Sequence, residues 1–362
     1  MSNIGRHAYR LTADCIWNSF RSSGKRHLIL TGDRGSGKTT LLSRLFPEGC
    51  PGVTTWARPG EAVYLKENTT GAAAQIGAFA PDLPGIENRM VPCQKGFLSL
   101  GVPALTRCMS AVGEWVTVDE VGYLEASCAE YQQALLQLLQ CKRVAAVVRK
   151  QEIPFLTQLR SREDVFLVDL DDPFGDIGCV IMASGMGKRF GGNKLTADFR
   201  GEPMLFRVLD ATQGIFRRRV VVTRHRDVAE LCEEQGIEVI LHDLPLRSDT
   251  VRLGVENMEG LQRCIFCAAD QPLLRRETVQ SLALACGNEP EYIWRTACEG
   301  TPGNPVVFPA WTFEQLRQLP EGKGGSAVIK KYPERLRAVN VRDENELKDV
   351  DTPEDLQELL ER

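Results

Sequence analysis

Short apolar runs alternate with amphipathic segments along most of the chain. In the first half, this pattern predicts strands at residues 27–31, 115–118, 144–148 and 165–170 and helices at 38–46, 124–140 and 154–160. Residues 50–113 are rich in Gly and Pro and show little periodicity, so loops and irregular strands are expected there.

The same alternation continues in the second half, after the turn-forming residues 171–176. It predicts strands at residues 179–183, 219–223, 237–241 and 264–268 and helices at 204–213, 228–235, 250–257 and 277–286. Strands joined by crossover helices form parallel sheets with helices on both faces. We therefore expect an α/β fold with two doubly wound, three-layer domains, residues 1–174 and residues 175–362.

Composition narrows the possible partners. The 362 residues carry a net charge of -4, and such a chain lacks the basic surface typical of nucleic-acid binders. No apolar stretch approaches the roughly 20 residues needed to span a bilayer, so no membrane association is expected. Residues 1–10 include basic side chains without a following apolar segment, which predicts no secretory signal and a cytoplasmic protein.

Cysteine and histidine usage indicates a reducing compartment and no structural metal. The 12 cysteines are irregularly spaced, and Cys264 and Cys267 fall in a predicted buried strand, which favours a role as small hydrophobic residues. The four histidines, which are His7, His27, His225 and His242, form no cluster with zinc spacing.

A first phosphate loop follows the strand at residues 27–31. Its Gly-x4-Gly-Lys-Thr spacing lets glycine amides surround phosphates, while the Lys neutralises charge and the Thr hydroxyl can bind Mg²⁺. The predicted nucleotide-binding residues are Gly32, Gly35, Gly37, Lys38, Thr39 and Thr40.

Asp119 and Glu120 follow the buried run 115–118. Asp119 occupies the place of a Walker B aspartate, so Thr39 and Asp119 are the predicted Mg²⁺ ligands and Glu120 would polarise a water. The alternative is that Glu120 is a solvated loop acid. No Asn-Lys-x-Asp element follows, so ATP and GTP both stay open for this domain.

The run from Asp119 to Glu125, with the loop and Val148-Arg149-Lys150, resembles the small nucleoside-triphosphatase family first described from thermophiles. The resemblance covers roughly residues 25–170. It implies hydrolysis of ATP, GTP or a similar triphosphate, without saying what the hydrolysis drives.

A second glycine-rich loop extends from Ala183 to Lys194. A dinucleotide site is disfavoured, because Phe190 replaces the third glycine and no strand-ending acid follows about 20 residues on. Arg189 and Lys194 instead place two cations near backbone amides, which suits charge building on departing pyrophosphate. The predicted nucleotide-binding residues here are Ala183, Ser184, Gly185, Met186 and Gly187.

The pattern Ala-x-Gly-x3-Arg-x-Gly-x2-Lys of this loop resembles the nucleotidyltransferases of molybdenum-cofactor maturation. Three later segments also match that family: an Asp-x-Pro element at Asp270, a substrate-side turn at 300–306 and a closing signature at 349–355. Residues 322–325 resemble its flexible acceptor-side loop. The resemblance implies Asp270 and Asp351 as metal ligands and acceptor contacts at Gly303, Asn304 and Pro305.

Alternatives exist within this resemblance. Instead of binding a metal, Asp351 could be only a neighbour of the helix cap expected at Thr352. Arg252 could be a solvent-exposed helix residue without contact to the nucleotide. Asp270 is harder to dismiss, because an acid straight after an apolar run lies at a strand's carboxyl end, where ligands of α/β folds bind.

The base preference follows from two further similarities. The loop begins Ala183-Ser184-Gly185, whereas the guanylyl branch has Ala-Gly-Gly and the cytidylyl branch Ala-Ala-Gly. The chain is closer to the cytidylyl branch but matches neither. Residues 247–252 also resemble the CTP-binding stretch of the isoprenoid-pathway cytidylyltransferase, which implies nucleotide contacts from Arg247 and Ser248.

The resemblances together imply transfer of CMP from CTP to molybdopterin or the molybdenum cofactor, with release of pyrophosphate. Lys194, Arg189 and Asp270 with Mg²⁺ would carry this reaction. NTP hydrolysis by the first domain, with Glu120 as its catalytic residue, would assist cofactor maturation or delivery to a molybdenum hydroxylase. The alternatives are a nucleotidyltransferase with another acceptor (guanylyl transfer to the cofactor, or a sugar or polyol phosphate) and a non-catalytic assembly factor switched by the NTPase.

Overall fold

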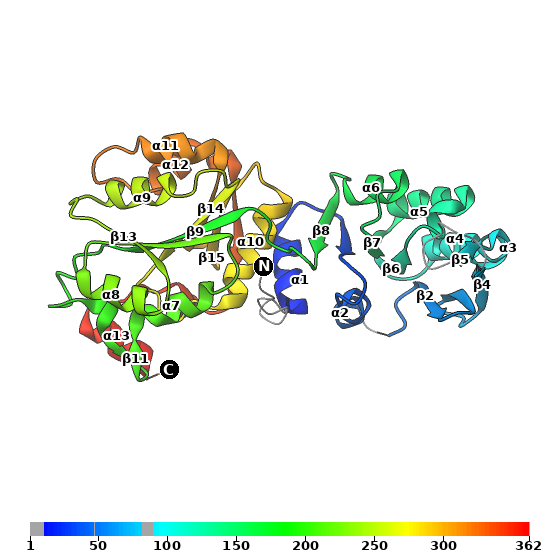
Figure 1. The fold of residues 1–362 in the computed structure, drawn as a ribbon, viewed down its shortest axis with the longest axis horizontal. Coiled ribbons are helices and arrows are strands. Elements are labelled where there is room, and N and C mark those ends of the chain that lie inside the picture. The colour runs from blue at the N-terminus through cyan, green and yellow to red at the C-terminus, as the bar shows by residue number, and fades with distance from the viewer. Residues whose placement is uncertain (1–10, 47, 82–89, 362) are drawn as a thin grey trace. The chain divides into compact units, whose positions relative to one another are not determined.

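The computed structural model describes residues 11–46, 48–81 and 90–361. Residues 1–10, on which the secretory-signal expectation and His7 fall, lie outside that part. The chain divides into two compact units, one formed by residues 24–173 and the other by residues 11–23 with 174–361. Each unit is an α/β structure around a mostly parallel sheet, which confirms the expected fold class (Figure 1).

Unit 24–173 contains an eight-stranded sheet in the order β5-β4-β3-β2-β6-β7-β1-β8. Its strands are β1 (His27–Thr31), β2 (Gly52–Arg58), β3 (Ala62–Glu67), β4 (Ala73–Phe79), β5 (Met90–Pro92), β6 (Trp115–Val121), β7 (Arg143–Val148) and β8 (Val165–Asp169). Its α-helices are α2 (Lys38–Leu45), α3 (Gln94–Gly96), α4 (Val102–Ser110), α5 (Ala129–Cys141) and α6 (Pro154–Arg160).

The segment 50–113 is more regular than its sequence predicts. Strands β3, β4 and β5 pair antiparallel and extend the parallel part of the sheet through β2. Strand β2 pairs with β6, and a Cβ at Gly52 would lie 1.9 Å from the carbonyl oxygen of Thr117. Glycine therefore permits this approach of two backbones, and the Gly content that suggested loops belongs partly to sheet pairing.

The second unit contains a seven-stranded sheet in the order β13-β12-β9-β14-β16-β15-β17. Its strands are β9 (Ile177–Ala183), β12 (Arg218–Thr223), β13 (Glu238–Leu241), β14 (Arg263–Ala268), β15 (Ile293–Cys298), β16 (Thr301–Pro309) and β17 (Leu336–Asn340), and β10 (Asp198–Phe199) pairs separately with β11 (Glu202–Pro203). Its α-helices are α1 (Ala13–Ser22), α7 (Met204–Thr212), α8 (Arg226–Glu234), α9 (Arg247–Glu256), α10 (Arg276–Asn288), α11 (Phe313–Arg317), α12 (Ser326–Lys331) and α13 (Pro353–Leu360).

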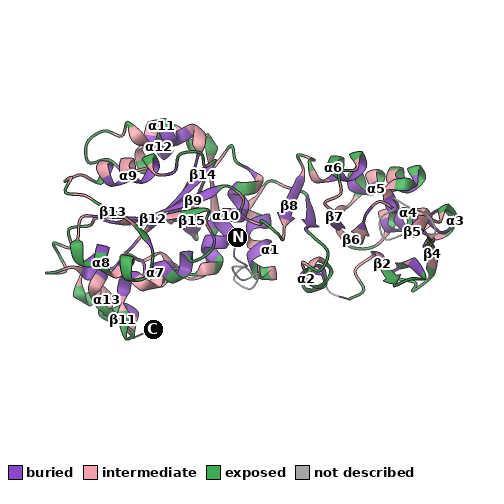
Figure 2. Cartoon of the chain, in the orientation of Figure 1, coloured by how far each residue is buried: buried purple, intermediate pink, exposed green. Residues whose placement is uncertain are grey.

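The centre of this sheet is apolar and buried, as Figure 2 shows for β9 and β14. Cys264 and Cys267 are fully buried in β14, which confirms their expected role as small hydrophobic residues. Strands β12, β9 and β14 run parallel, and Ala268 pairs with Met182. The residues that follow β9 and β14 therefore leave the sheet at the same edge, which places the loop after Ala183 beside Asp270.

Helix α1 packs within the second unit, although it precedes β1 in the chain. The Ser19 hydroxyl donates a hydrogen bond to the Ser281 carbonyl of α10 (3.0 Å), and residues 278–286 of α10 are all buried. The unit boundary thus differs from the expected domain boundary, which assigned residues 1–174 to the first domain. Periodicity alone cannot reveal this packing, because an amphipathic helix does not specify which distant surface covers it.

Among the described residues, none of the helices has the length and apolar character needed to cross a membrane.

Candidate active sites

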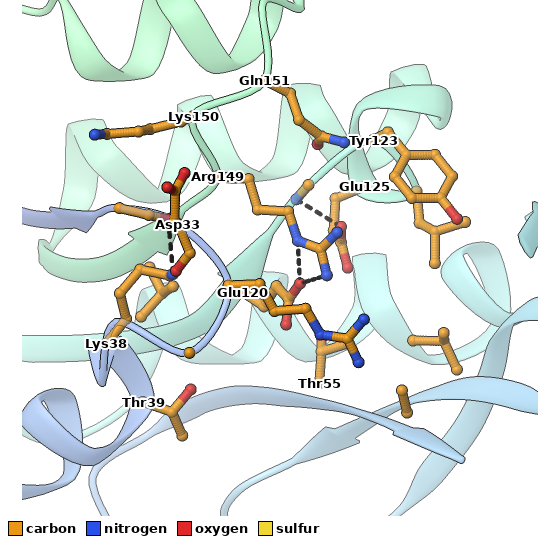
Figure 3. Close-up of a pocket in the computed structure, with 18 of the residues that line it drawn as sticks. Asp33, Lys38, Thr39, Thr55, Glu120, Tyr123, Glu125, Arg149, Lys150 and Gln151 are labelled. Carbon is orange, nitrogen blue, oxygen red and sulfur yellow. Dashed lines mark hydrogen bonds and ion pairs between the residues drawn. The ribbon is translucent and has the colours of Figure 1, made fainter. Parts of the chain in front are cut away.

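The first site surrounds the loop between β1 and α2. Gly32, Gly35 and Gly37 have φ values of 140°, 81° and 93°, a left-handed region that L side chains rarely adopt. The glycines therefore let this loop curl at the N-terminus of α2, where backbone N–H groups favour phosphate oxygens. A cavity of about 740 Å³ adjoins the loop, and all six predicted nucleotide-binding residues line it (Figure 3).

Lys38 is folded back onto its own loop. Its Nζ donates to the carbonyl oxygens of Gly32 (2.8 Å) and Asp33 (2.6 Å) and to Ser36 Oγ (3.2 Å). Burial lowers the pKa of Lys38, although the nearby charges of Glu120 and Asp171 oppose that shift. The ammonium group is thus held where phosphate oxygens can replace carbonyls as its partners.

Thr39 and Asp119 meet on one side of the loop. Thr39 Oγ1 donates to Asp119 Oδ1 (3.0 Å), and the Asp119 side chain is buried. Burial raises the pKa of Asp119 to about 6, against the lowering effect of the Thr39 hydrogen bond. These hard oxygen atoms suit Mg²⁺, which usually binds one or two carboxylates together with substrate phosphates.

Glu120 lies beside a cation to which the sequence assigned no role, although that residue is part of the resemblance at 148–150. Its φ is 89°, and its carboxylate forms an ion pair with Arg149, which follows β7. Both side chains line the cavity with Lys38. Strand β7, which Arg149 follows, lies between β1 and β6 in the sheet. The position of Arg149 straight after a buried strand was therefore the feature of the sequence that could have indicated a place in this site.

A second residue of that resemblance without an assigned role is Glu125, whose side chain is 2% exposed. Its Oε2 accepts a hydrogen bond from the Gly122 backbone N–H (2.8 Å), while its Oε1 is buried without a partner. Burial raises its pKa to about 7. The sequence shows only an acid near the start of a predicted helix, which does not indicate a buried carboxylate.

The second site lies at the carboxyl edge of the sheet around β9. A cavity of about 540 Å³ is lined by residues from six segments of the chain. The sequence-predicted residues that line it are Ala183, Ser184, Gly185, Met186, Gly187, Arg189, Lys194, Arg247, Asp270, Asn304 and Asp351. Ser248, Gly303 and Pro305 do not line it.

Two of those three residues have identifiable contacts instead. Ser248 Oγ accepts a hydrogen bond from the Gly322 N–H (3.2 Å), so it contacts the glycine-rich segment 322–325. Gly303 has no side chain that could reach the cavity, and a Cβ at this position would lie 2.6 Å from Leu347 Cδ1. Gly303 and Asn304 lie in strand β16, so the turn expected at residues 300–306 is wrong for most of that segment, and the close packing of Leu347 favours glycine at position 303.

The loop after β9 closes on itself rather than leading into an α-helix. A Cβ on Gly187 would lie 2.4 Å from the Gly192 carbonyl oxygen, and the loop ends in a single 3₁₀ turn, Lys194–Thr196. The short pair β10–β11 follows this turn, and the helix predicted at residues 204–213 begins only afterwards, as α7. The groups that this loop presents to the cavity are therefore backbone amides and cationic side chains, without the N-terminus of an α-helix.

Lys194 links two acids at the centre of this site. Its Nζ lies 2.6 Å from Asp270 Oδ2 and 3.0 Å from Asp351 Oδ1, and Arg189 lies 2.5 Å from the other Asp351 oxygen. Burial alone would lower the pKa of Lys194, but Asp270 and Asp351 outweigh it and raise the pKa. The two cations predicted to face a triphosphate are thus paired with the two acids predicted to bind metal.

Asp349 is an acid of this site that the sequence reasoning missed. It lines the cavity, and burial together with the Asp270 charge raises its pKa to about 6. Asp351 and Thr352 also take part in the predicted helix cap, because both N–H groups donate to Asp355 while Thr352 Oγ1 accepts from the Asp355 N–H. Capping and a role in the cavity are therefore compatible for Asp351.

Among the described residues, no group of three His, Cys, Asp or Glu side chains is arranged to hold a metal by itself. Asp270 and Asp351 nevertheless offer carboxylate oxygens toward one point, currently bridged by Lys194. Mg²⁺ bound mainly through substrate phosphates needs only one or two such carboxylates, so the donor set fits.

Comparisons with known proteins agree with this division. A protein-family model for an NTPase matches residues 61–173, and one for a MobA-like NTP transferase domain matches residues 179–336. Nucleoside-triphosphatase THEP1 of Thermotoga maritima is 25% identical over 154 residues, which is 40% of this chain and 86% of that protein.

Two further proteins resemble the second unit. A probable molybdenum cofactor guanylyltransferase of Thermococcus gammatolerans is 26% identical over 161 residues, covering 44% of this chain and 75% of that protein. A nucleotidyl transferase structure from Methanothermobacter has a TM-score of 0.45 at 22% identity, covering 52% of this chain and 97% of that one. The chain therefore joins an NTPase domain to a MobA-like NTP transferase domain.

Proposed function

We propose that the second domain transfers CMP from CTP to the terminal phosphate of molybdopterin or the molybdenum cofactor and releases pyrophosphate. The observation that carries this proposal is the convergence of Arg189, Lys194 and Asp270 on one cavity beside the loop after β9. Transfer at phosphorus depends mainly on positioning and charge neutralisation, and these groups supply both.

Asp270 and Asp351 would hold Mg²⁺ together with the triphosphate, and the ion would neutralise phosphate charge when bound. Lys194 and Arg189 would then turn from these acids to the phosphates, because the acids gain another positive partner. The pyrophosphate leaves carrying negative charge, which the two cations stabilise.

The base and the acceptor rest on similarity. Arg247, from the stretch that resembles a CTP site, lines the cavity. A 3-deoxy-manno-octulosonate cytidylyltransferase of Acinetobacter baumannii is 28% identical over 103 residues, covering 41% of that protein. That cytidylyl relative favours CTP, whereas the guanylyltransferase relatives favour the molybdenum cofactor as the acceptor.

For the first domain we propose hydrolysis of ATP or GTP. Lys38 would bind the β- and γ-phosphates, Thr39 and Asp119 would hold Mg²⁺, and Glu120 would orient the attacking water. Arg149 would neutralise charge on the γ-phosphate once the nucleotide displaces it from Glu120. This hydrolysis would assist handover of the cofactor, for example to a molybdenum hydroxylase.

One experiment tests both assignments. The full chain is incubated with each of the four NTPs, with and without molybdopterin, and pyrophosphate and phosphate are recorded separately. We expect molybdopterin-dependent pyrophosphate release with CTP, and molybdopterin-independent phosphate release with ATP or GTP. Pyrophosphate release with GTP alone would replace the cytidylyl assignment by a guanylyl one. In a parallel incubation with a 3-deoxy sugar acid in place of molybdopterin, release of pyrophosphate only there would exclude the cofactor as acceptor.

A further inference from the structure

The cavity of the first domain extends beyond the groups that NTP hydrolysis uses. Besides the phosphate loop and Glu120, its walls come from β2, β3, β5 and the segment after β6. The residues of this additional part, called the distal chamber below, are Thr55, Ala57, Val63, Met90, Tyr123, Leu124 and Glu125. Figure 3 shows Lys38 and Tyr123 at opposite sides of the cavity, with Glu120 and Arg149 between them.

The sheet order fixes where the distal chamber lies relative to a nucleotide. The phosphate loop follows β1, and Glu120 is the penultimate residue of β6. Thr55, Val63 and Met90 of the chamber belong to strands on the far side of β6. In the proposed function, the γ-phosphate lies between Lys38 and Glu120. The chamber is therefore on the side from which a nucleophile approaches the γ-phosphorus, opposite to the departing nucleoside diphosphate.

The chamber walls combine apolar surface with polar atoms that lack partners. Val63, Met90 and Leu124 are buried side chains that line the cavity. Three buried polar atoms of residues in the cavity wall have no hydrogen bond, namely Thr55 Oγ1, Glu125 Oε1 and Gln151 Oε1. Buried polar atoms are nearly always satisfied, so these oxygens would gain hydrogen bonds from a ligand that reaches them.

We propose that the first domain also transfers the γ-phosphoryl group to a hydroxyl of a nucleoside-type ring compound bound in the distal chamber. This inference rests on the proposed NTP site. Apolar walls and the Tyr123 ring fit a flat heterocycle, and the free Glu125 oxygen fits a ring N–H donor. Attack by water alone would need none of these features.

The transfer balances as a simple displacement. The hydroxyl oxygen of the acceptor forms a bond to the γ-phosphorus while the bond from that phosphorus to the β,γ-bridging oxygen breaks. The electron pair leaves with the nucleoside diphosphate, and the hydroxyl proton passes to the Glu120 carboxylate. Arg149, adjacent to Glu120, stabilises the charge on the transferred group.

The test uses the full chain with Mg²⁺ and ATP labelled on its γ-phosphate, at about pH 8.5, where Glu125 is mostly ionised. Guanosine and uridine carry a ring N–H, whereas adenosine and cytidine do not. We expect labelled nucleoside monophosphate from guanosine or uridine at least about tenfold above that from adenosine or cytidine, a ratio that corresponds to about 1.4 kcal/mol.

Glu125→Gln sharpens the test. Because Oε2 of Glu125 accepts the Gly122 N–H, a glutamine would keep its oxygen there and direct its NH₂ group into the chamber. The preference should then reverse toward adenosine or cytidine, whose rings offer an acceptor nitrogen. Glu114→Gln, at a surface position 67% exposed, is the matched control and should change nothing.

Thr55→Val provides a second variant of nearly the same shape, in case Glu125→Gln does not fold. It should reduce ester formation without changing the base preference. Release of label only as inorganic phosphate with all four nucleosides would overturn the inference and leave the NTP site standing. Absence of both phosphate and ester would overturn the proposed NTP site and this inference with it.

Discussion

The lysines of the two phosphate loops are held by different kinds of partner. Lys38 donates to neutral carbonyl and hydroxyl oxygens of its own loop, whereas Lys194 lies between the carboxylates of Asp270 and Asp351. The pKa of Lys38 is correspondingly lowered by burial, and that of Lys194 is raised by its acidic partners. The first loop holds its cation ready for phosphate, while the second must exchange internal ion pairs for substrate contacts.

This difference predicts different consequences of metal and substrate binding. At the first site, phosphates replace weak neutral partners, so nucleotide binding needs little rearrangement of charge. At the second site, a cation placed between Asp270 and Asp351 would release Lys194 toward the phosphates. Metal and triphosphate binding are therefore expected to reinforce one another more strongly at the second site.

The largest expected effect follows from removing the loop lysine of the first site. Lys38→Ala should lower phosphate release about 10³-fold, because one preorganised charge-stabilising group is lost and no other loop cation takes the same position. Pyrophosphate release by the second domain should stay unchanged in the same sample. Equal loss of both products would show that the two sites do not act separately.

Asp270→Asn tests the second site in the same way, with pyrophosphate and phosphate recorded separately. We expect pyrophosphate release to fall about 10²-fold, a smaller loss because Asp351 and Asp349 still offer carboxylates nearby. Phosphate release should continue. The matched control is Asp14→Asn on the exposed face of α1, and a similar loss in that variant would point to misfolding instead of altered chemistry.

Lys194→Ala probes the internal ion pairs directly. Removing the ammonium group leaves Asp270 and Asp351 without their shared cation, so Mn²⁺ should bind the nucleotide-free protein more tightly. We expect about a tenfold gain, or about 1.4 kcal/mol, measured by electron paramagnetic resonance of free Mn²⁺. Lys188→Ala serves as a control within the same loop. Unchanged Mn²⁺ affinity in Lys194→Ala would contradict the competition between lysine and metal.

The remaining prediction concerns the stability of the first unit and its dependence on pH. His27 is buried, its Nδ1 accepts the Val144 N–H, and burial lowers its pKa from 6.5 to about 4. The unfolded chain therefore binds this proton more readily, so His27 should reduce stability as the pH falls from 6.5 toward 4. The free energy of unfolding should change by at most about 1.4 kcal/mol per pH unit through this group.

His27→Asn keeps a side-chain acceptor for Val144 but removes the titration. The urea midpoint of the variant, measured at about pH 4.5, 5.5 and 7, should fall less steeply with acid than that of the unchanged protein. The carboxylates other than Asp164, which lies 3.4 Å from His27 Nε2, titrate alike in both proteins and cancel in the comparison. Parallel curves would show that His27 is not buried as a neutral side chain.

Much of the local structure was predictable because its signals lie close together in the chain. The strands at β1, β7, β9 and β14, and helix α6, match their predicted positions within two residues. The Thr352 cap was also predicted, and Asp355 completes it three residues later. Such features depend on hydrophobic period and on turn or cap residues a few positions apart.

The groups around each cavity were predictable only in part. Lys38 and Thr39 belong to a compact motif, but Arg149 and Glu125 become neighbours of Glu120 only through sheet order and burial. Ser248 shows the opposite case, because its motif suggested a nucleotide contact whereas its hydroxyl contacts the backbone of Gly322. A motif names chemical groups, and packing decides which of them face a cavity.

The sequence by itself determined that the chain has two phosphate loops of different kinds, each with an acid at the end of a buried strand. Only the tertiary structure decided that Lys194 lies between Asp270 and Asp351, that α1 packs against α10, and that the first cavity continues past Glu120. The physical reason is distance along the chain. Loop conformation follows from neighbouring residues, whereas ion pairs and cavity walls join segments that only a folded sheet brings together.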